Sequence, residues 1–217
     1  MEKPNFEELY ERVLKNKRPP EEIDAYFEQE REDALAKSLE GQGIPRRIIQ
    51  TLNAPLKSTR AVRQVRKIFL APKEAWVLVL SGDKGCGKSV AAGLYLKLRA
   101  ERALDNQEQP PESSVWYSAV RMARMSSYNG DFDKMLRTHL MVIDDLGVEY
   151  LDNKGYFEQR FDELMNDRYE NFGRTIITTN LNAQDFKERY SDRVTSRMRE
   201  GFRVGGGFIE IPEESLR

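Results

Sequence analysis

The feature that most constrains this chain is the octapeptide GDKGCGKS at residues 82–89, which has the form G-x-x-x-x-G-K-[S/T]. Its glycines allow successive backbone N–H groups to turn inward around a phosphate. Lys88 places a positive charge beside the outer phosphates, and the Ser89 hydroxyl is a ligand for Mg²⁺. The motif therefore predicts binding of ATP with Mg²⁺, through residues Gly82, Asp83, Lys84, Gly85, Cys86, Gly87, Lys88, Ser89 and Val90.

The sequence on either side of this motif fits a strand followed by a helix. Residues 76–80 form an apolar run of the length of a buried strand, and residues 90–104 have the pattern of a helix. The phosphates would then lie at the N-terminus of that helix, where unpaired N–H groups and the helix dipole favour anions. A chance match in a glycine-rich loop is the competing interpretation, and the flanking pattern argues against it.

Further strands and a helix are predicted after this unit. The segments 115–118, 140–145, 174–180 and 208–211 have the apolar character of strands, and residues 156–172 have a helical pattern. Alternation of strands and helices favours a parallel sheet covered by helices on both faces. The expected fold class is therefore the three-layer α/β fold of P-loop NTPases.

Polar side chains end two of these strands. Asp144 and Asp145 close the run 140–145, in the form of a Walker B motif. Asp144 is the candidate metal ligand, and Asp145 is the candidate that orients or deprotonates the attacking water. Asn180 ends the strand 174–180, which in additional-strand NTPases inserts between the first and third strands. Its amide could then touch the terminal phosphate, although Asn is also a common turn residue after a strand.

Two arginines near the C-terminal end of the sequence share one helix face. Arg193 and Arg197 are separated by four residues in a predicted helix. They could form a basic surface or salt-bridge helix, or they could supply an arginine finger to the nucleotide of a neighbouring subunit. The residues alone leave both interpretations open.

Charge is distributed unevenly, although the whole chain has a net charge of only −1. Residues 1–42 hold 12 acidic and 7 basic residues, whereas residues 43–75 hold 1 acidic and 8 basic residues. Such asymmetry suggests different partners for the two segments. Within the basic segment, Ser58 is expected to cap a helix that runs to Leu70 and carries a basic stripe, which could meet DNA phosphates or simply be solvated.

The first 42 residues are expected to form two helices. The first has an apolar stripe, and the second begins at Pro20 and ends near Gly41. Such a short segment buries too little to be stable alone, so it must pack on the rest of the chain or on a partner, and we favour the partner. The stripe consists of Phe6, Leu9, Tyr10, Val13 and Leu14.

Composition excludes several classes of protein. One cysteine excludes an intramolecular disulfide framework and a cysteine-cluster zinc site, and one histidine, His139, excludes catalysis by a histidine-based triad. The sequence has neither an 18-residue apolar run nor the apolar core of a signal peptide. We therefore expect a cytoplasmic protein without membrane contact.

Together these motifs resemble the DnaC/IstB family of AAA+ ATPases. The resemblance rests on GDKGCGKS at 82–89, VIDDLG at 142–147, TIITTNL at 175–181 and DRVTSRM at 192–198, and GIPR at 43–46 resembles the start of that family's ATPase domain. It covers about residues 43–203. It implies an AAA+ ATPase domain over residues 43–217, preceded by an N-terminal helical partner-binding region over residues 1–42.

The resemblance also implies roles for individual residues. Lys88 and Ser89 bind nucleotide and metal, Asp144 is the Walker B aspartate, and Asn180 is sensor 1. Arg197 matches the trans-acting arginine finger, with Arg193 as the second candidate. Two departures matter: Asp145 stands where many AAA+ enzymes have glutamate, and the 20 residues after Arg197 are too few for a full C-terminal helical lid.

Family members load DnaB-type replicative helicases onto single-stranded DNA or assist transposases. The resemblance therefore implies a helicase loader that assembles as a homo-oligomer in the ATP state, with the nucleotide between subunits. The alternatives are an IstB-like transposition helper and an adaptor that binds nucleotide but hardly hydrolyses it. In this family the DNA-contacting region usually lies just past the second strand. In this chain that region interleaves aromatic and basic residues, which suits base stacking and phosphate contact, although a solvated helix would explain them equally well. They are Tyr117, Arg121, Arg124 and Tyr128.

Overall fold

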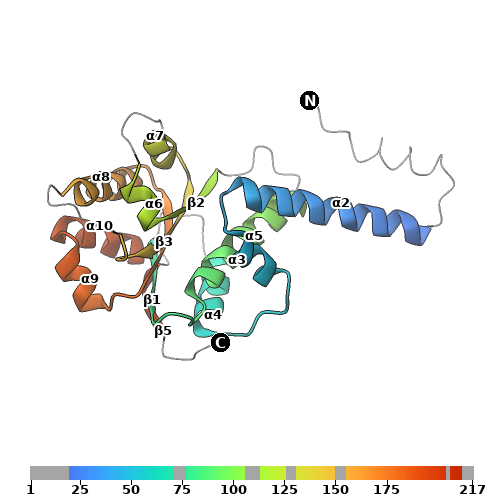
Figure 1. Cartoon of the computed structure of the whole chain (residues 1–217), viewed down its shortest axis with the longest axis horizontal. Coiled ribbons are helices and arrows are strands. Elements are labelled where there is room, and N and C mark those ends of the chain that lie inside the picture. Colours follow the sequence, from blue (N-terminus) through green and yellow to red (C-terminus); the bar gives the residue numbers. More distant parts are fainter. Residues whose placement is uncertain are drawn as a thin grey trace.

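The centre of the molecule is a five-stranded, fully parallel sheet (Figure 1). The computed structural model describes residues 20–70, 77–105, 113–125, 131–149, 155–203 and 206–211. Within these residues the strands are β1 (Val77–Gly82), β2 (Ser114–Ser118), β3 (Leu140–Leu146), β4 (Arg174–Thr179) and β5 (Gly207–Ile211). They lie in the order β2-β3-β4-β1-β5, so β4 inserts between β1 and β3 as predicted.

Both faces of the sheet are covered, which explains why its strands are continuous apolar runs. Leu78 and Leu80 of β1 belong to the core under one group of helices, and Val77 and Val79 belong to the core under the other. The first group is α2 (Pro20–Gly41), α3 (Arg46–Leu52), α4 (Arg60–Phe69) and α5 (Lys88–Asp105). The second group is α6 (Ala119–Ala123), α7 (Asp131–Leu136), α8 (Tyr156–Glu170), α9 (Ala183–Arg189) and α10 (Asp192–Arg203). The expected three-layer α/β fold is therefore confirmed.

Two parts of the basic segment are helices that pack on the body of the protein. Ile48, Ile49 and Leu52 of α3 are buried against α5, and one face of α4 is buried in the same core. The cap of α4 is Thr59 rather than Ser58: the Thr59 hydroxyl accepts a hydrogen bond from Val62 N at 3.1 Å. The prediction of Ser58 was wrong by one residue because either hydroxyl satisfies the capping pattern.

The N-terminal helix α2 begins at Pro20 and ends at Gly41, as predicted. Its last turns pack on α5, where Leu39 is 1% exposed, and Arg31 forms an ion pair with Asp105 at 2.7 Å. Its earlier turns project away from the body (Figure 1). The predicted apolar stripe at residues 6–14 lies outside the described residues, so its packing and the domain boundary at residue 42 stay predictions.

Candidate functional site

The phosphate-loop motif forms the turn between β1 and α5. Gly85 and Gly87 have φ angles of 93° and 89°, in the left-handed region that glycine adopts without strain. Helix α5 then begins at Lys88, so the N–H groups of its first turn have no partner within the helix. Unpaired N–H groups at a helix N-terminus after a glycine turn favour binding of a phosphate.

Lys88 is held at the centre of this site. Its side chain is buried, and its ammonium donates to the carbonyls of Gly82 at 2.7 Å and Asp83 at 2.8 Å and to Asn180 Oδ1 at 3.1 Å. Asn180 reaches Lys88 because it directly follows β4, which pairs with β1. The structure thus brings together the two residues predicted from separate motifs.

Ser89 and Asp144 are also brought together, 55 residues apart in sequence. The Ser89 hydroxyl donates to Asp144 Oδ1 at 2.7 Å, and the Thr178 hydroxyl donates to the same oxygen at 2.6 Å. A hydroxyl and a carboxylate are the hard oxygen ligands that Mg²⁺ prefers. These two side chains therefore fit the metal that the sequence predicts.

Asp144 is mostly buried at the end of β3, with 8% of its surface exposed. Burial raises the pKa of its carboxyl, and the charge of Asp145 raises it further, while the hydrogen bonds from Thr178 and Ser89 and the charge of Lys88 oppose the rise. The carboxylate is thus placed where its charge is costly until a cation arrives. Such a raised pKa at a polar site is typical of functional carboxylates.

Asp145 differs from Asp144 in exposure and backbone conformation. Its side chain is exposed, and its φ angle is 57°, a left-handed conformation that few residues other than glycine adopt. The N–H of Asp145 donates to the Thr178 hydroxyl at 2.9 Å, which holds this turn against β4. One threonine therefore positions both aspartates, and an unusual backbone conformation at such a place is a pointer to function.

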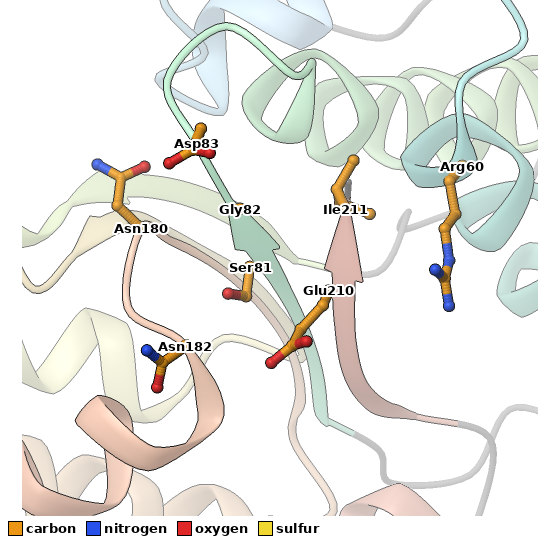
Figure 2. Close-up of a pocket in the computed structure, with 8 residues that line it drawn as sticks. All are labelled: Arg60, Ser81, Gly82, Asp83, Asn180, Asn182, Glu210 and Ile211. Carbon is orange, nitrogen blue, oxygen red and sulfur yellow. The ribbon is translucent and has the colours of Figure 1, made fainter. Parts of the chain in front are cut away.

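A pocket of about 460 Å³ opens beside the phosphate loop (Figure 2). It lies at the carboxyl ends of β4, β1 and β5, which is where ligands bind in open α/β sheets. Figure 2 shows Asn180 and Asn182 on one side of the β1 end and Arg60 of α4 on the other. The lining residues are Arg60, Ser81, Gly82, Asp83, Asn180, Asn182, Glu210 and Ile211.

The two candidate finger arginines both contact one carboxylate of their own chain. Arg193 Nη1 lies 3.5 Å from Asp162 Oδ2, and Arg197 Nη1 lies 3.5 Å from Asp162 Oδ1. The Arg193 side chain is 64% exposed and that of Arg197 is 18% exposed. The structure therefore places both on α10 against α8, and exposure favours Arg193 for reaching another molecule.

No family model matches this chain, and no curated protein sequence matches it. Solved structures with the same fold do match. The crystal structure of DnaI superimposes with a TM-score of 0.59 over 80% of this chain and 94% of DnaI, at 21% identity. AMPPCP-bound DnaA from Aquifex aeolicus gives a TM-score of 0.53 at 18% identity, over 75% of this chain and 49% of that protein.

Domain III of the replication initiation protein DnaA from Thermotoga maritima gives a TM-score of 0.52 at 16% identity, over 73% of this chain and 65% of that one. The chain has the AAA+ fold. The fold that the resemblance to DnaC-type proteins implies is thereby confirmed. Within the described residues of this AAA+ structure, no helix is long and apolar enough to span a membrane.

One predicted DNA contact is wrong. Tyr117 is 4% exposed and belongs to the core between the sheet and α6–α10, so its ring cannot stack on a base. The guanidinium of Arg121 lies over that ring, 5.3 Å from its centre. Side chains alternate between the two faces of a strand, and in β2 this alternation turns Tyr117 toward the core. The interleaved aromatic and basic residues of the sequence had suggested an exposed surface instead. Tyr128 lies outside the described residues.

Two residues at or beside the candidate site were missed from sequence. Thr178 contacts Asp144 and the backbone of Asp145, yet it lies within a strand of several threonines and has no distinguishing signal. Glu149 is buried just after β3 and resembles any loop carboxylate in the sequence. Two of its partners, Arg189 and Tyr190, lie about 40 residues later, so no local pattern could have found them.

Proposed function

We propose that this chain is an AAA+ ATPase that binds ATP with Mg²⁺ at the phosphate loop and hydrolyses it at an interface between copies of the chain. The proposal rests on two neighbouring contacts. The Ser89 hydroxyl lies 2.7 Å from Asp144 Oδ1, and the Lys88 ammonium lies 3.1 Å from Asn180 Oδ1. Four residues from three separate motifs meet where a triphosphate on α5 would end.

Each residue has a chemical role in this proposal. Phosphate oxygens would replace the carbonyls of Gly82 and Asp83 as acceptors for the Lys88 ammonium. Ser89 and Asp144 would hold Mg²⁺, which neutralises charge on the phosphates. Asp145, exposed at the end of β3, would orient the attacking water, and the Asn180 amide would contact the terminal phosphate.

The site is completed by a second copy of the chain in this proposal. An arginine from α10 would stabilise the transition-state charge on the neighbour's terminal phosphate. Both candidates are held by Asp162 through long, partly exposed ion pairs, which contribute little stability. Either arginine could therefore leave Asp162 at small cost, and its greater exposure makes Arg193 as strong a candidate as Arg197.

As the biological role, we propose loading of a DnaB-type replicative helicase onto single-stranded DNA. The support is the shared fold with DnaI over 94% of that protein, together with an acidic N-terminal segment whose helix α2 projects from the ATPase body. Residues 1–42 would hold the helicase, and ATP binding and hydrolysis would control assembly and release.

The test is ATP turnover by purified protein with and without single-stranded DNA and a purified DnaB-type helicase. The proposal expects Mg²⁺-dependent turnover and a stable complex with the helicase. Tight ATP binding without turnover would favour the nucleotide-binding adaptor. The short side chain of Asp145, at the position where many AAA+ enzymes have glutamate, is the feature that supports this alternative. A complex with a transposase instead of the helicase would favour the IstB-like transposition helper.

A further inference from the structure

A buried carboxylate joins the loop after β3 to the segment that leads into α10. Glu149 lies three residues past the end of β3, and none of its side chain is exposed. Its two oxygens face two different parts of the chain. Oε2 accepts a hydrogen bond from the N–H of Gly147 at 2.6 Å, whereas Oε1 accepts from residues at the end of α9.

The α9 side of this bridge consists of a charged and a neutral donor. Arg189 donates to Glu149 Oε1 from Nε at 3.2 Å and from Nη2 at 3.0 Å, and its Nη2 also lies 3.1 Å from the Glu149 carbonyl. The Tyr190 hydroxyl donates to Oε1 at 2.8 Å. We call Glu149, Gly147, Arg189 and Tyr190 the Glu149 bridge.

Both ends of the Glu149 bridge are rigidly packed. Gly147 has a φ angle of 104°, and a Cβ there would lie 2.9 Å from the side chain of Leu181. The Tyr190 ring is 3% exposed and lies 5.0 Å from the Phe161 ring and 4.8 Å from the Phe186 ring, measured between centroids. Both ends of the bridge therefore lie against packed side chains, and the Glu149 carboxylate links them.

Glu149 also shifts the pKa values of its two donors on the α9 side. Burial alone would lower the pKa of Arg189, but the hydrogen bond and charge of Glu149 raise it above its usual value. Burial together with the charge of Glu149 raises the pKa of the Tyr190 hydroxyl as well. Both donors, Arg189 and Tyr190, therefore keep the protons that they donate to Glu149.

The bridge connects the two halves of the proposed active site. Gly147 follows the metal candidate Asp144 by three residues, and Tyr190 precedes the finger candidate Arg193 by three residues. We propose that Glu149 is a positioning residue that fixes the start of α10, and so the arginine offered to a neighbouring copy, relative to its own β3 carboxylates. This inference rests on the proposed ATPase with an arginine supplied in trans.

The test uses Glu149→Gln, which keeps the volume of the side chain. Its amide oxygen can still accept from Arg189 and Tyr190, but its NH₂ group would then face the N–H of Gly147, donor against donor. We expect ATP affinity to stay within about threefold of the original, because Lys88 and Ser89 are unchanged. Turnover should fall by about 100-fold, the loss that a 1 Å misplacement of a catalytic group produces.

Mixing experiments separate a defect in trans from a defect in the chain's own phosphate site. Lys88→Ala protein lacks the phosphate site but keeps the finger, whereas Glu149→Gln protein should keep the phosphate site and misplace the finger. In an equal mixture that co-assembles at random, about one interface in four joins the two intact halves. We therefore expect turnover of the mixture to approach a quarter of the original, far above either protein alone.

The controls assign each outcome. Glu188→Gln changes an exposed carboxylate on the same helix as Arg189 and should change nothing, because the Glu188 carboxylate accepts a hydrogen bond from Gln184 and takes no part in the bridge. Tyr190→Phe removes one donor, keeps the ring packing and should show a milder turnover defect, which keeps the test valid if Glu149→Gln folds poorly.

Arg193→Ala and Arg197→Ala, each mixed with Lys88→Ala, test the trans finger itself. If a finger variant is rescued and Glu149→Gln is not, the bridge acts only within its own chain and this inference is wrong. If no finger variant is rescued in co-assembled protein, the finger is not supplied in trans, and the proposed interface site fails together with this inference.

Discussion

Asp144→Asn should make the protein more stable and less functional at the same time. The carboxylate of Asp144 is 8% exposed, and burial raises its pKa. Both hydroxyl donors, from Ser89 and Thr178, contact the same oxygen, Oδ1. Asparagine keeps an acceptor at that position and removes the buried charge.

The size of the effect follows from two opposing contributions. A buried ion carries a desolvation penalty of several kcal/mol, whereas a buried amide costs about 1–3 kcal/mol. Against this, two hydrogen bonds to a charged acceptor become neutral ones, each weaker by about 1 kcal/mol. The variant should therefore gain about 1 kcal/mol in free energy of unfolding, a rise of about 2–4 °C in Tm for a chain of this size.

The pH dependence of Tm is a second test of whether Asp144→Asn stabilises the folded protein. Because the folded-state pKa of Asp144 is raised, the wild-type carboxyl favours the folded state most when protonated, and this stability is lost as pH rises through the folded pKa. The Tm advantage of Asp144→Asn should thus be full at about pH 7.5 and should shrink as the pH is lowered toward the ordinary range of aspartate.

The assay is thermal unfolding without nucleotide, paired with calorimetry of ATP binding in Mg²⁺ and in EDTA. The variant should lose the Mg²⁺-dependent part of ATP affinity while its Tm rises. Asp133→Asn, at an exposed position of α7, is the matched control and should change neither quantity. A lower Tm for Asp144→Asn with unchanged Mg²⁺ dependence would refute the reasoning, because Asp144 would then be a structural carboxylate.

Three further perturbations test other parts of the molecule. Lys88→Ala should weaken ATP binding by several kcal/mol, because the Lys88 ammonium offsets phosphate charge in a partly desolvated site. If calorimetry finds an unchanged ATP affinity, residues 82–89 do not bind the phosphates. Gly147→Ala should lower stability by about 1–3 kcal/mol, because its left-handed backbone and the nearby Leu181 side chain both oppose a Cβ, and denaturant titration measures this loss. Deletion of residues 1–42 should spare ATP binding but abolish the complex with a DnaB-type helicase in a pull-down, although loss of Leu39 from the core should also lower Tm.

The sheet and most of the phosphate site could be predicted because their signals are local. A buried parallel strand requires a continuous apolar run, and the residue that ends such a strand lies at the site whatever the rest of the chain does. Asp144 lies near the end of β3, Asn180 directly follows β4, and Lys88 begins α5 after the loop that follows β1. Their meeting follows from strand order alone.

What could not be predicted depends on tertiary contacts. The short helix α3 follows Pro45 in a segment whose charges obscure its apolar residues, and only packing on α5 reveals it. Tyr117 is an aromatic residue that the sheet turns inward. The Glu149 bridge joins a loop to a helix end 40 residues away, and a carboxylate in a loop gives no sign in the sequence of whether it will be buried.

For the choice between Arg193 and Arg197, the sequence motif and the structure favour different residues. Position in the DRVTSRM motif favours Arg197, whereas exposure favours Arg193. A finger must reach another molecule, so exposure bears on function directly, but the ion pairs with Asp162 are long and weak enough that a neighbouring copy could draw out either side chain. In our proposal the start of α10 sets where both arginines point, and Tyr190, two residues before that start, is held by a hydrogen bond to Glu149. If the arginine acts in trans as proposed, the geometry of the finger would depend on the buried carboxylate of Glu149 as well as on the arginine itself.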